Sequence, residues 1–183
     1  MKKYALIGTS CVGKTTLVNE LNNLLKKEIP GINVEVVSEA ARFYFSYNVT
    51  SEPFSYFHQG RIQTIARIQE ELIYYKNPNI ILTDRSVLDS IAYVKATGGN
   101  GFANKLYEKE KKWLSTYTNF FLLDPKGIPY KTDAIRKESK NTREGFHKTF
   151  LETLSDFNLP YTLISGSFDT RLKRMLSTIL SEL

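Results

Sequence analysis

The residues from Gly8 to Thr15 have types and spacing suited to binding phosphate. They read Gly-Thr-Ser-Cys-Val-Gly-Lys-Thr and match the pattern G-x-x-x-x-G-K-[ST] at every fixed position. The two glycines let the backbone wrap closely around a phosphate, so that successive N–H groups point at its anionic oxygens. The sequence therefore predicts a phosphate loop that binds ATP together with Mg²⁺.

Side chains of this loop have separate expected roles. Lys14 is expected to reach the β- and γ-phosphates, and Thr15 to ligate Mg²⁺ through its hydroxyl. The helix that follows would present its positive N-terminus to the same oxygens. The isolated Cys11 is expected to be a small filler and not a nucleophile. The predicted nucleotide contacts in the loop are Gly8, Ser10, Cys11, Val12, Gly13, Lys14, Thr15 and Thr16.

A carboxylate and an arginine directly follow the apolar run at 80–83. Asp84 is placed to hold Mg²⁺ through water or to accept a proton from the phosphoryl acceptor. Arg85 is expected to clamp a phosphate or the acceptor. The structural alternative is a helix N-terminus at which Asp84 and Ser86 are capping groups.

A second carboxylate, Glu39, follows the apolar run at 33–37. It is a candidate general base that would orient the acceptor hydroxyl. Arg42 lies three residues further along, on the same helical face, and is expected to contact the acceptor. The structural alternative is a first-turn glutamate that complements the helix dipole.

Other candidate site residues rest on weaker patterns. The segment at about 125–143 is polar and basic and is predicted to be a lid, from which Arg136 and Arg143 would stabilise the transferring phosphoryl group. A solvated charged loop is the alternative. Gly166 and Arg171 are expected to flank the adenine ring, and Gln63 to hydrogen-bond the base edge of the acceptor.

Short apolar runs alternate along the chain with segments of helical periodicity. Strands are predicted at 3–7, 33–37, 80–83, 120–124 and 161–165, and helices at 14–29, from about 39, and at 53–76, 86–97, 103–117, 142–157 and 168–183. The run Gly98-Gly99-Asn100-Gly101 is expected to be a flexible break. This alternation predicts one α/β domain, 1–183, with a parallel sheet between helices. Ligands of such sheets bind at the carboxyl ends of the strands.

The composition limits the function classes. The chain has 183 residues, one cysteine and a net charge of +6. No window approaches the roughly 20 apolar residues of a membrane span, and the N-terminal apolar run is too short for a signal peptide to be expected. We therefore expect a cytoplasmic protein without a disulfide within the chain. The positive charge suits anionic partners such as nucleotides or nucleic acid.

Together, the phosphate loop, the Glu39-Ala40-Ala41-Arg42 and Asp84-Arg85-Ser86 motifs, the glutamine-bearing third helix and an Asp-x-x-Arg lid resemble the P-loop nucleoside and nucleotide kinase superfamily. The most similar branch contains the kinase domain of bacterial nicotinamide riboside kinases and related phage and bacterial ATP-binding proteins. The resemblance implies a three-layer fold with a five-stranded parallel sheet in the order 2-3-1-4-5. It also implies transfer of the ATP γ-phosphate to a hydroxyl or phosphate of a nucleoside-like acceptor, with Glu39 or Asp84 as the acceptor-side carboxylate and Arg136 in the lid. Ala134 follows Asp133 where relatives commonly have glycine.

Two alternatives remain open. Some phage members of the superfamily phosphorylate hydroxymethyluracil in DNA, and basic clusters such as Lys109-Lys111-Lys112 would suit a polyanionic acceptor. The same clusters would also suit solvated helix faces. The second alternative is a regulatory NTP-binding switch that has no acceptor. The absence of a guanine-reading Asn-Lys-x-Asp motif argues against a GTPase.

Overall fold

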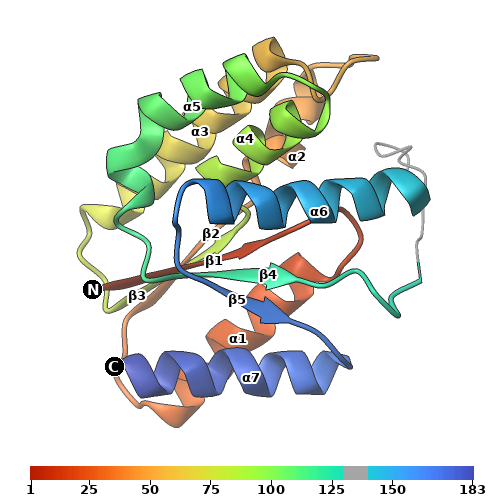
Figure 1. Ribbon diagram of the computed structural model, residues 1–183. Helices are drawn as coiled ribbons and strands as arrows, with labels where there is room; N and C mark the ends of the chain where they lie inside the picture. The colour runs from red at the N-terminus through yellow and green to blue at the C-terminus, as the bar shows by residue number, and fades with distance from the viewer. Residues whose placement is uncertain (130–139) are drawn as a thin grey trace.

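The computed structural model describes residues 1–129 and 140–183 as a five-stranded sheet between two layers of helices (Figure 1). All neighbouring strands run parallel, and their order is β2-β3-β1-β4-β5. The predicted fold class and strand order are therefore confirmed. The strands are β1 (Lys2–Ile7), β2 (Val34–Val37), β3 (Ile80–Asp84), β4 (Asn119–Leu123) and β5 (Tyr161–Ile164).

The helices form a thin layer on one face of the sheet and a thick layer on the other (Figure 1). The thin layer consists of α1 (Lys14–Glu28) and α7 (Phe168–Glu182). The thick layer contains α2 (Ala40–Tyr47), α3 (Tyr56–Tyr74), α4 (Val87–Ala96), α5 (Asn100–Leu114) and α6 (Lys140–Asp156). No helix in the described ranges has both the length and the apolar character needed to cross a membrane.

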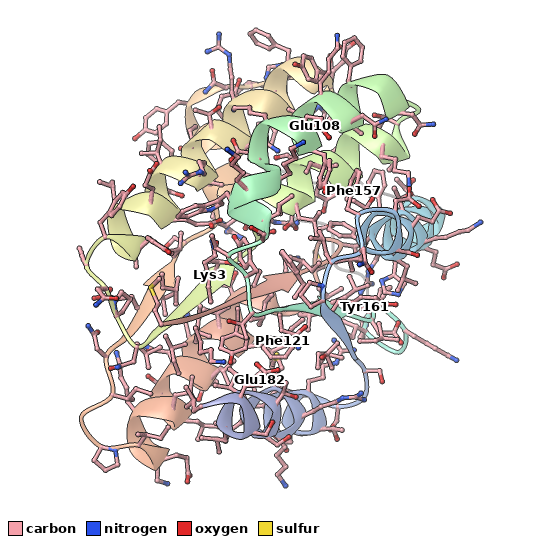
Figure 2. The ribbon with its side chains drawn as sticks, turned by 60° about the vertical axis from the view of Figure 1, so that its left-hand side comes forward. Lys3, Glu108, Phe121, Phe157, Tyr161 and Glu182 are labelled. Atoms are coloured by element: carbon pink, nitrogen blue, oxygen red, sulfur yellow. The ribbon has the colours of Figure 1, made fainter. Side chains whose placement is uncertain are left out.

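Alternation of side chains along the central strand divides the core in two. Tyr4 and Leu6 of β1 pack against the α1 and α7 side, whereas Ala5 and Ile7 pack against the α3 to α6 side. This is the period of two that a strand imposes. Figure 2 shows the same division, with Lys3 on the side of the thick layer and Phe121 toward α7.

The predicted flexible break between α4 and α5 is instead a tight corner. Gly99 donates its backbone N–H to the Val94 carbonyl at 3.1 Å. A Cβ atom at Gly99 would lie 2.9 Å from that carbonyl oxygen, so a larger residue would open the corner. Because the corner is closed, α5 begins at Asn100, three residues earlier than expected. Similarly, α6 begins at Lys140, so the last residues of the predicted lid belong to a helix.

The parallel sheet brings three separate segments to its carboxyl edge. Leu6 of β1 pairs with Asp84 at the end of β3, and Val37 of β2 pairs with Thr83. The phosphate loop after β1, Glu39 after β2 and Asp84 therefore emerge at one edge. This arrangement follows from the strand order, because β3 lies between β1 and β2.

Gly8 is expected to be intolerant of substitution because it combines a φ of 128° with a close backbone contact. A Cβ atom there would lie 3.2 Å from the Leu123 carbonyl oxygen. We expect Gly8→Ala to lower the free energy of unfolding by about 1–3 kcal/mol. Gly60→Ala is the control, because Gly60 lies inside α3 and its Cβ would make ordinary contact with the Leu106 side chain of α5. This change should stabilise the protein by about 0.5–1 kcal/mol. Denaturant unfolding of both variants measures this, and equal changes would contradict it.

Candidate functional site

The phosphate loop connects β1 to α1 through three residues of positive φ. These are Gly8 at 128°, Cys11 at 56° and Gly13 at 86°, and Gly13 is the N-cap of α1. Left-handed residues within a turn make successive N–H groups converge on a concavity that binds anions. The Val12 side chain is buried among the α1 side core residues, so its backbone is the part placed to contact a phosphate.

Lys14 lies over the loop that it is expected to serve. Its Nζ donates hydrogen bonds to the carbonyl oxygens of Gly8, at 3.0 Å, and Thr9. The side chain is 5% exposed. The pKa of Lys14 is lowered to about 7, first by burial and then by the nearby Arg85 guanidinium, against the attraction of Asp84. An anionic phosphate would restore the ammonium form because it supplies an opposite charge.

Thr15 and Asp84 meet across the loop. The Thr15 hydroxyl donates a hydrogen bond to Oδ2 of Asp84. Asp84 Oδ1 is buried and has no hydrogen-bond partner among the described residues. A hydroxyl beside a carboxylate with an uncommitted oxygen is a donor set that fits Mg²⁺. The described residues contain no group of three or more His, Cys, Asp or Glu that could hold a metal ion, so the remaining ligands would be nucleotide oxygens and water.

Arg85 connects the acceptor side to the phosphate loop. Its Nε donates to Glu39 Oε1 at 2.8 Å, and its Nη1 donates to the Gly8 carbonyl at 3.1 Å and to Asp89 Oδ1 at 3.0 Å. The side chain is 8% exposed, and the backbone φ is 74°. These two nitrogens are hydrogen-bonded within the protein, so Arg85 positions Glu39. Arg85 also lines the cavity described below, and its contact with a phosphate or the acceptor stays a prediction.

Of Asp84 and Ser86, the two residues considered as helix caps, only Ser86 caps a helix. Ser86 is the N-cap of α4 and forms a capping box with Asp89, whereas the Asp84 carboxylate is held by Thr15. Burial raises the pKa of Asp89, although Arg85 and Lys14 oppose that shift. The Asp84-Arg85-Ser86 motif thus combines a helix cap with the placement of two charged groups.

Glu39 lies at the start of α2, where it is positioned by arginines. It occupies the N-cap position without making a side-chain cap hydrogen bond. Its carboxylate is 2.8 Å from Arg85 Nε and 3.6 Å from Arg42 Nε. The side chain of Arg42 is 60% exposed, which leaves its guanidinium accessible from solvent.

A cavity of about 730 Å³ lies beside these charged groups, within the range of about 300–1,000 Å³ typical of small-molecule sites. Glu39, Arg42, Asp84 and Arg85 line it. Three aromatic side chains, Phe45, Phe54 and Tyr93, also line it. Phe54 stacks on Tyr93 with ring centroids 5.0 Å apart. The cavity therefore offers a charged end and apolar aromatic walls, which suit a planar heterocycle joined to a polar group.

Two predicted nucleotide or lid residues instead bind backbone on the β4 and β5 side. Arg171 donates to the carbonyl oxygens of Gly166, at 2.8 Å, and Asp124, at 2.7 Å. Arg143 lies in α6 and donates to the Ile128 and Pro125 carbonyls. Arg143 lines a separate cavity of about 710 Å³ with the segment 124–129. It does not line the cavity beside Glu39 and Asp84, and neither Gly166 nor Arg171 lines either cavity.

Gln63 differs from its expected placement. It is fully buried, and its Nε2 donates to the backbone carbonyls of Val87, at 3.2 Å, and Leu106, at 3.4 Å. It joins α3 to α4 and α5. It does not line the cavity beside Glu39 and Asp84, whereas Gln59 and Glu70 of the same helix do. Helical periodicity could have suggested Gln59, but the sequence does not reveal which face of α3 turns to the cavity. Arg136 lies outside the described residues, and its lid role stays a prediction.

Residues 3–171 match the family described as an AAA domain. The chain belongs to this family. A comparison with curated proteins found no match. The family assignment covers the phosphate loop and both carboxylate motifs.

Solved structures share the fold at low sequence identity. A NadR protein in complex with NAD and AMP-PNP matches with a TM-score of 0.75 and 19% identity, over 98% of this chain and 49% of that one. A NadR protein in complex with NR matches with a TM-score of 0.76 and 20% identity, over 98% and 51%. Deoxyadenosine kinase from M. mycoides matches with a TM-score of 0.67 and 16% identity, over 98% and 99%. The chain spans about half the length of the NadR chains, and these likenesses confirm the P-loop kinase fold.

Nucleotide binding is expected to be linked to proton uptake by Lys14. The pKa of this lysine is lowered to about 7 by burial in the free protein, and a bound triphosphate would raise it. At about pH 8 we therefore expect ATP to bind with uptake of up to one proton, and at about pH 6 with almost none. Calorimetry in buffers of different ionisation enthalpy measures the uptake. In Lys14→Met it should vanish at both pH values, and unchanged uptake in that variant would contradict the assignment.

Proposed function

We propose that the protein is an ATP-dependent kinase that transfers the γ-phosphate to a hydroxyl of a nucleoside-like acceptor. The observation that carries the proposal is the position of Asp84. Its carboxylate accepts a hydrogen bond from Thr15 of the phosphate loop, and the same residue lines the acceptor cavity. A nucleotide in the loop and a molecule in the cavity would therefore meet at one carboxylate. The alternative of an NTP-binding switch without an acceptor does not account for this cavity.

In this proposal the Asp84 and Glu39 carboxylates have different roles. Thr15 and Asp84 would hold Mg²⁺, which supplies charge neutralisation at the β- and γ-phosphates when bound. Glu39 would take the proton from the acceptor hydroxyl as its oxygen bonds to the γ-phosphorus and the bond to the ADP oxygen breaks. Arg85 holds Glu39 toward the phosphate loop through its bond to the Gly8 carbonyl. Lys14 would stay with the transferring group.

Gly166, Arg171 and Arg42 would bind parts of the two substrates other than the transferring phosphoryl group. Gly166 lies at the turn after β5, and the Arg171 guanidinium ties that turn to Asp124. We propose that this pair shapes the adenine end of the nucleotide site. Arg42, which is exposed at the charged end of the cavity, would bind a polar or anionic group of the acceptor.

Contacts of the basic cluster favour a small acceptor over DNA. Lys109 lies 3.5 Å from Glu110 and donates to Thr64, and Lys111 pairs with Glu108 at 2.5 Å. Two of the three lysines are thus partly neutralised by neighbours on their own helix. The cavity of about 730 Å³ also suits one nucleoside-sized molecule.

A phosphate-transfer assay tests the proposal directly. Radiolabelled ATP with Mg²⁺ would be incubated with a panel of nucleosides, nucleotides and hydroxymethyluracil-containing DNA, with Lys14→Ala as the inactive control. We expect transfer to at least one free nucleoside or nucleotide. Transfer to DNA alone, with binding that weakens steeply as salt rises, would establish the DNA kinase instead. ATP binding without transfer to any member would support the switch.

The division of roles predicts different defects for the two carboxylates. Glu39→Gln should lower kcat by about 10²–10⁴-fold with ATP affinity unchanged, because it removes only the proton acceptor. Asp84→Asn should raise the Mg²⁺ concentration needed for half-maximal rate, because it weakens the metal's carboxylate ligand. Magnesium titrations of the initial rate distinguish them. A normal magnesium requirement in Asp84→Asn would refute the metal role.

A further inference from the structure

The outer face of α3 carries large apolar side chains that the rest of the fold leaves exposed. Phe57, Ile68, Leu72 and Tyr75 are 59%, 52%, 64% and 76% exposed. The opposite face of the same helix is buried and includes Ile62. A helix at the surface of a globular protein is usually polar on its outer face, so the apolar outer face of α3 indicates that something packs against it.

The side chains on this face are spaced as in a helix that pairs with another helix. They follow one another at alternating intervals of four and three residues, at Phe57, Arg61, Thr64, Ile68, Glu71 and Tyr75. These residues, with Leu72 beside Glu71, form the α3 stripe, which is about 27 Å long. The same alternation places the a and d positions of a coiled coil on one side of each helix. The α3 stripe therefore has the geometry of one half of a helix pair.

The α3 stripe is complementary to itself when it is read in the opposite direction. Phe57 and Tyr75 are equally far along the helix from Ala66. Arg61 and Glu71 are also equally far from it. A second copy placed antiparallel, with a twofold axis level with Ala66, would therefore bring each Arg61 to a Glu71 of the other copy. The same placement brings each Phe57 to a Tyr75. A twofold interface requires such pairing, because both copies contribute the same surface.

Arg61 and Glu71 lie against the aromatic ends of the α3 stripe. The Arg61 guanidinium is 4.5 Å from the centroid of the Phe57 ring. Glu71 accepts a hydrogen bond from the Tyr75 hydroxyl at 3.3 Å and lies 3.1 Å from Arg67 Nη1. Each charge is thus held beside the apolar surface, where the charges of a helix pair set its register and orientation.

Exposed aromatic rings on the neighbouring helices widen this surface. Tyr56 stacks on Phe102 of α5 with ring centroids 4.6 Å apart. Phe43 and Tyr47 lie edge to face on α2, which packs against α3. Figure 1 shows α2, α3 and α5 together in the thick layer, at the end of the molecule opposite α1 and α7. Exposed apolar surface of this extent marks an interaction site.

We propose that two copies of this chain form a twofold-symmetric dimer in which the α3 stripes pack antiparallel against each other. Burial of the apolar side chains drives the association, and two Arg61–Glu71 pairs, one at each end, set its direction and register. Charge complementarity within the stripe favours a second copy over an unrelated partner. Each copy keeps its acceptor cavity open, because Gln59 and Ile62, which line the cavity, lie on the opposite face of α3.

Charge reversal tests the pairing of Arg61 with Glu71. Arg61→Glu and Glu71→Arg each place like charges at both ends of the dimer, and we expect each to weaken dimerisation by about tenfold or more. An equimolar mixture of the two variants restores both opposite-charge pairs and should dimerise nearly as tightly as the wild type. Arg174→Glu, on the exposed side of α7, is the matched control and should leave the dimer unchanged. Sedimentation velocity over a range of protein concentrations measures these changes.

Ile68→Glu tests the apolar part of the α3 stripe. It puts a charge at the centre of the interface and should abolish the dimer, whereas Leu180→Glu on α7, which is also exposed, should not. A wild type that stays monomeric up to about 0.1 mM would overturn the proposal. A dimer that survives Ile68→Glu, or a mixture of the two charge variants that stays monomeric, would also overturn it. Monomeric protein that binds phosphatidylcholine vesicles, and loses that binding in Ile68→Glu, would assign the stripe to a membrane surface instead.

Discussion

The guanidinium of Arg85 holds the functional edge of this protein together. It reaches Glu39 at the end of β2, Asp89 in α4 and the Gly8 carbonyl at the end of β1. A buried cation of this kind needs anionic or carbonyl partners on every side, since an unpaired buried charge is strongly destabilising. Arg85 therefore fixes the acceptor-side carboxylate relative to the phosphate loop. The backbone at this residue is left-handed, with a φ of 74°.

In the proposed function, the two substrates would bind over different halves of the sheet. The phosphate loop follows β1, which lies in the centre. Strands β2 and β3 on one side supply Glu39, Asp84 and Arg85 to the acceptor cavity. Strands β4 and β5 on the other side supply the Asp124 and Gly166 backbone that Arg171 joins. The γ-phosphate would lie between the halves, which is the topological switch point of an open parallel sheet.

Several polar side chains serve the interior by binding backbone or one another. Arg143 and Arg171 hold carbonyl oxygens near the ends of β4 and β5, and Gln63 joins three helices. These hydrogen bonds connect segments that are far apart in the sequence.

The sequence alone determined three features, because each depends on a local pattern. The hydrophobic period gave the succession of strands and helices, and the glycine spacing gave the phosphate loop. The residue types at the strand ends gave the positions of Glu39 and Asp84. It also led, through resemblance, to the strand order. Tertiary structure alone decided which partner each polar residue meets. Gln59 and Gln63 lie four residues apart on one helix, yet one lines the cavity and the other is buried against backbone. Arg85 and Arg171 have the type expected for phosphate or base contact, yet both are committed to the protein. The physical reason is that an arginine or glutamine pairs equally well with a ligand or with a carbonyl, and only the packing of distant segments settles which one is within reach.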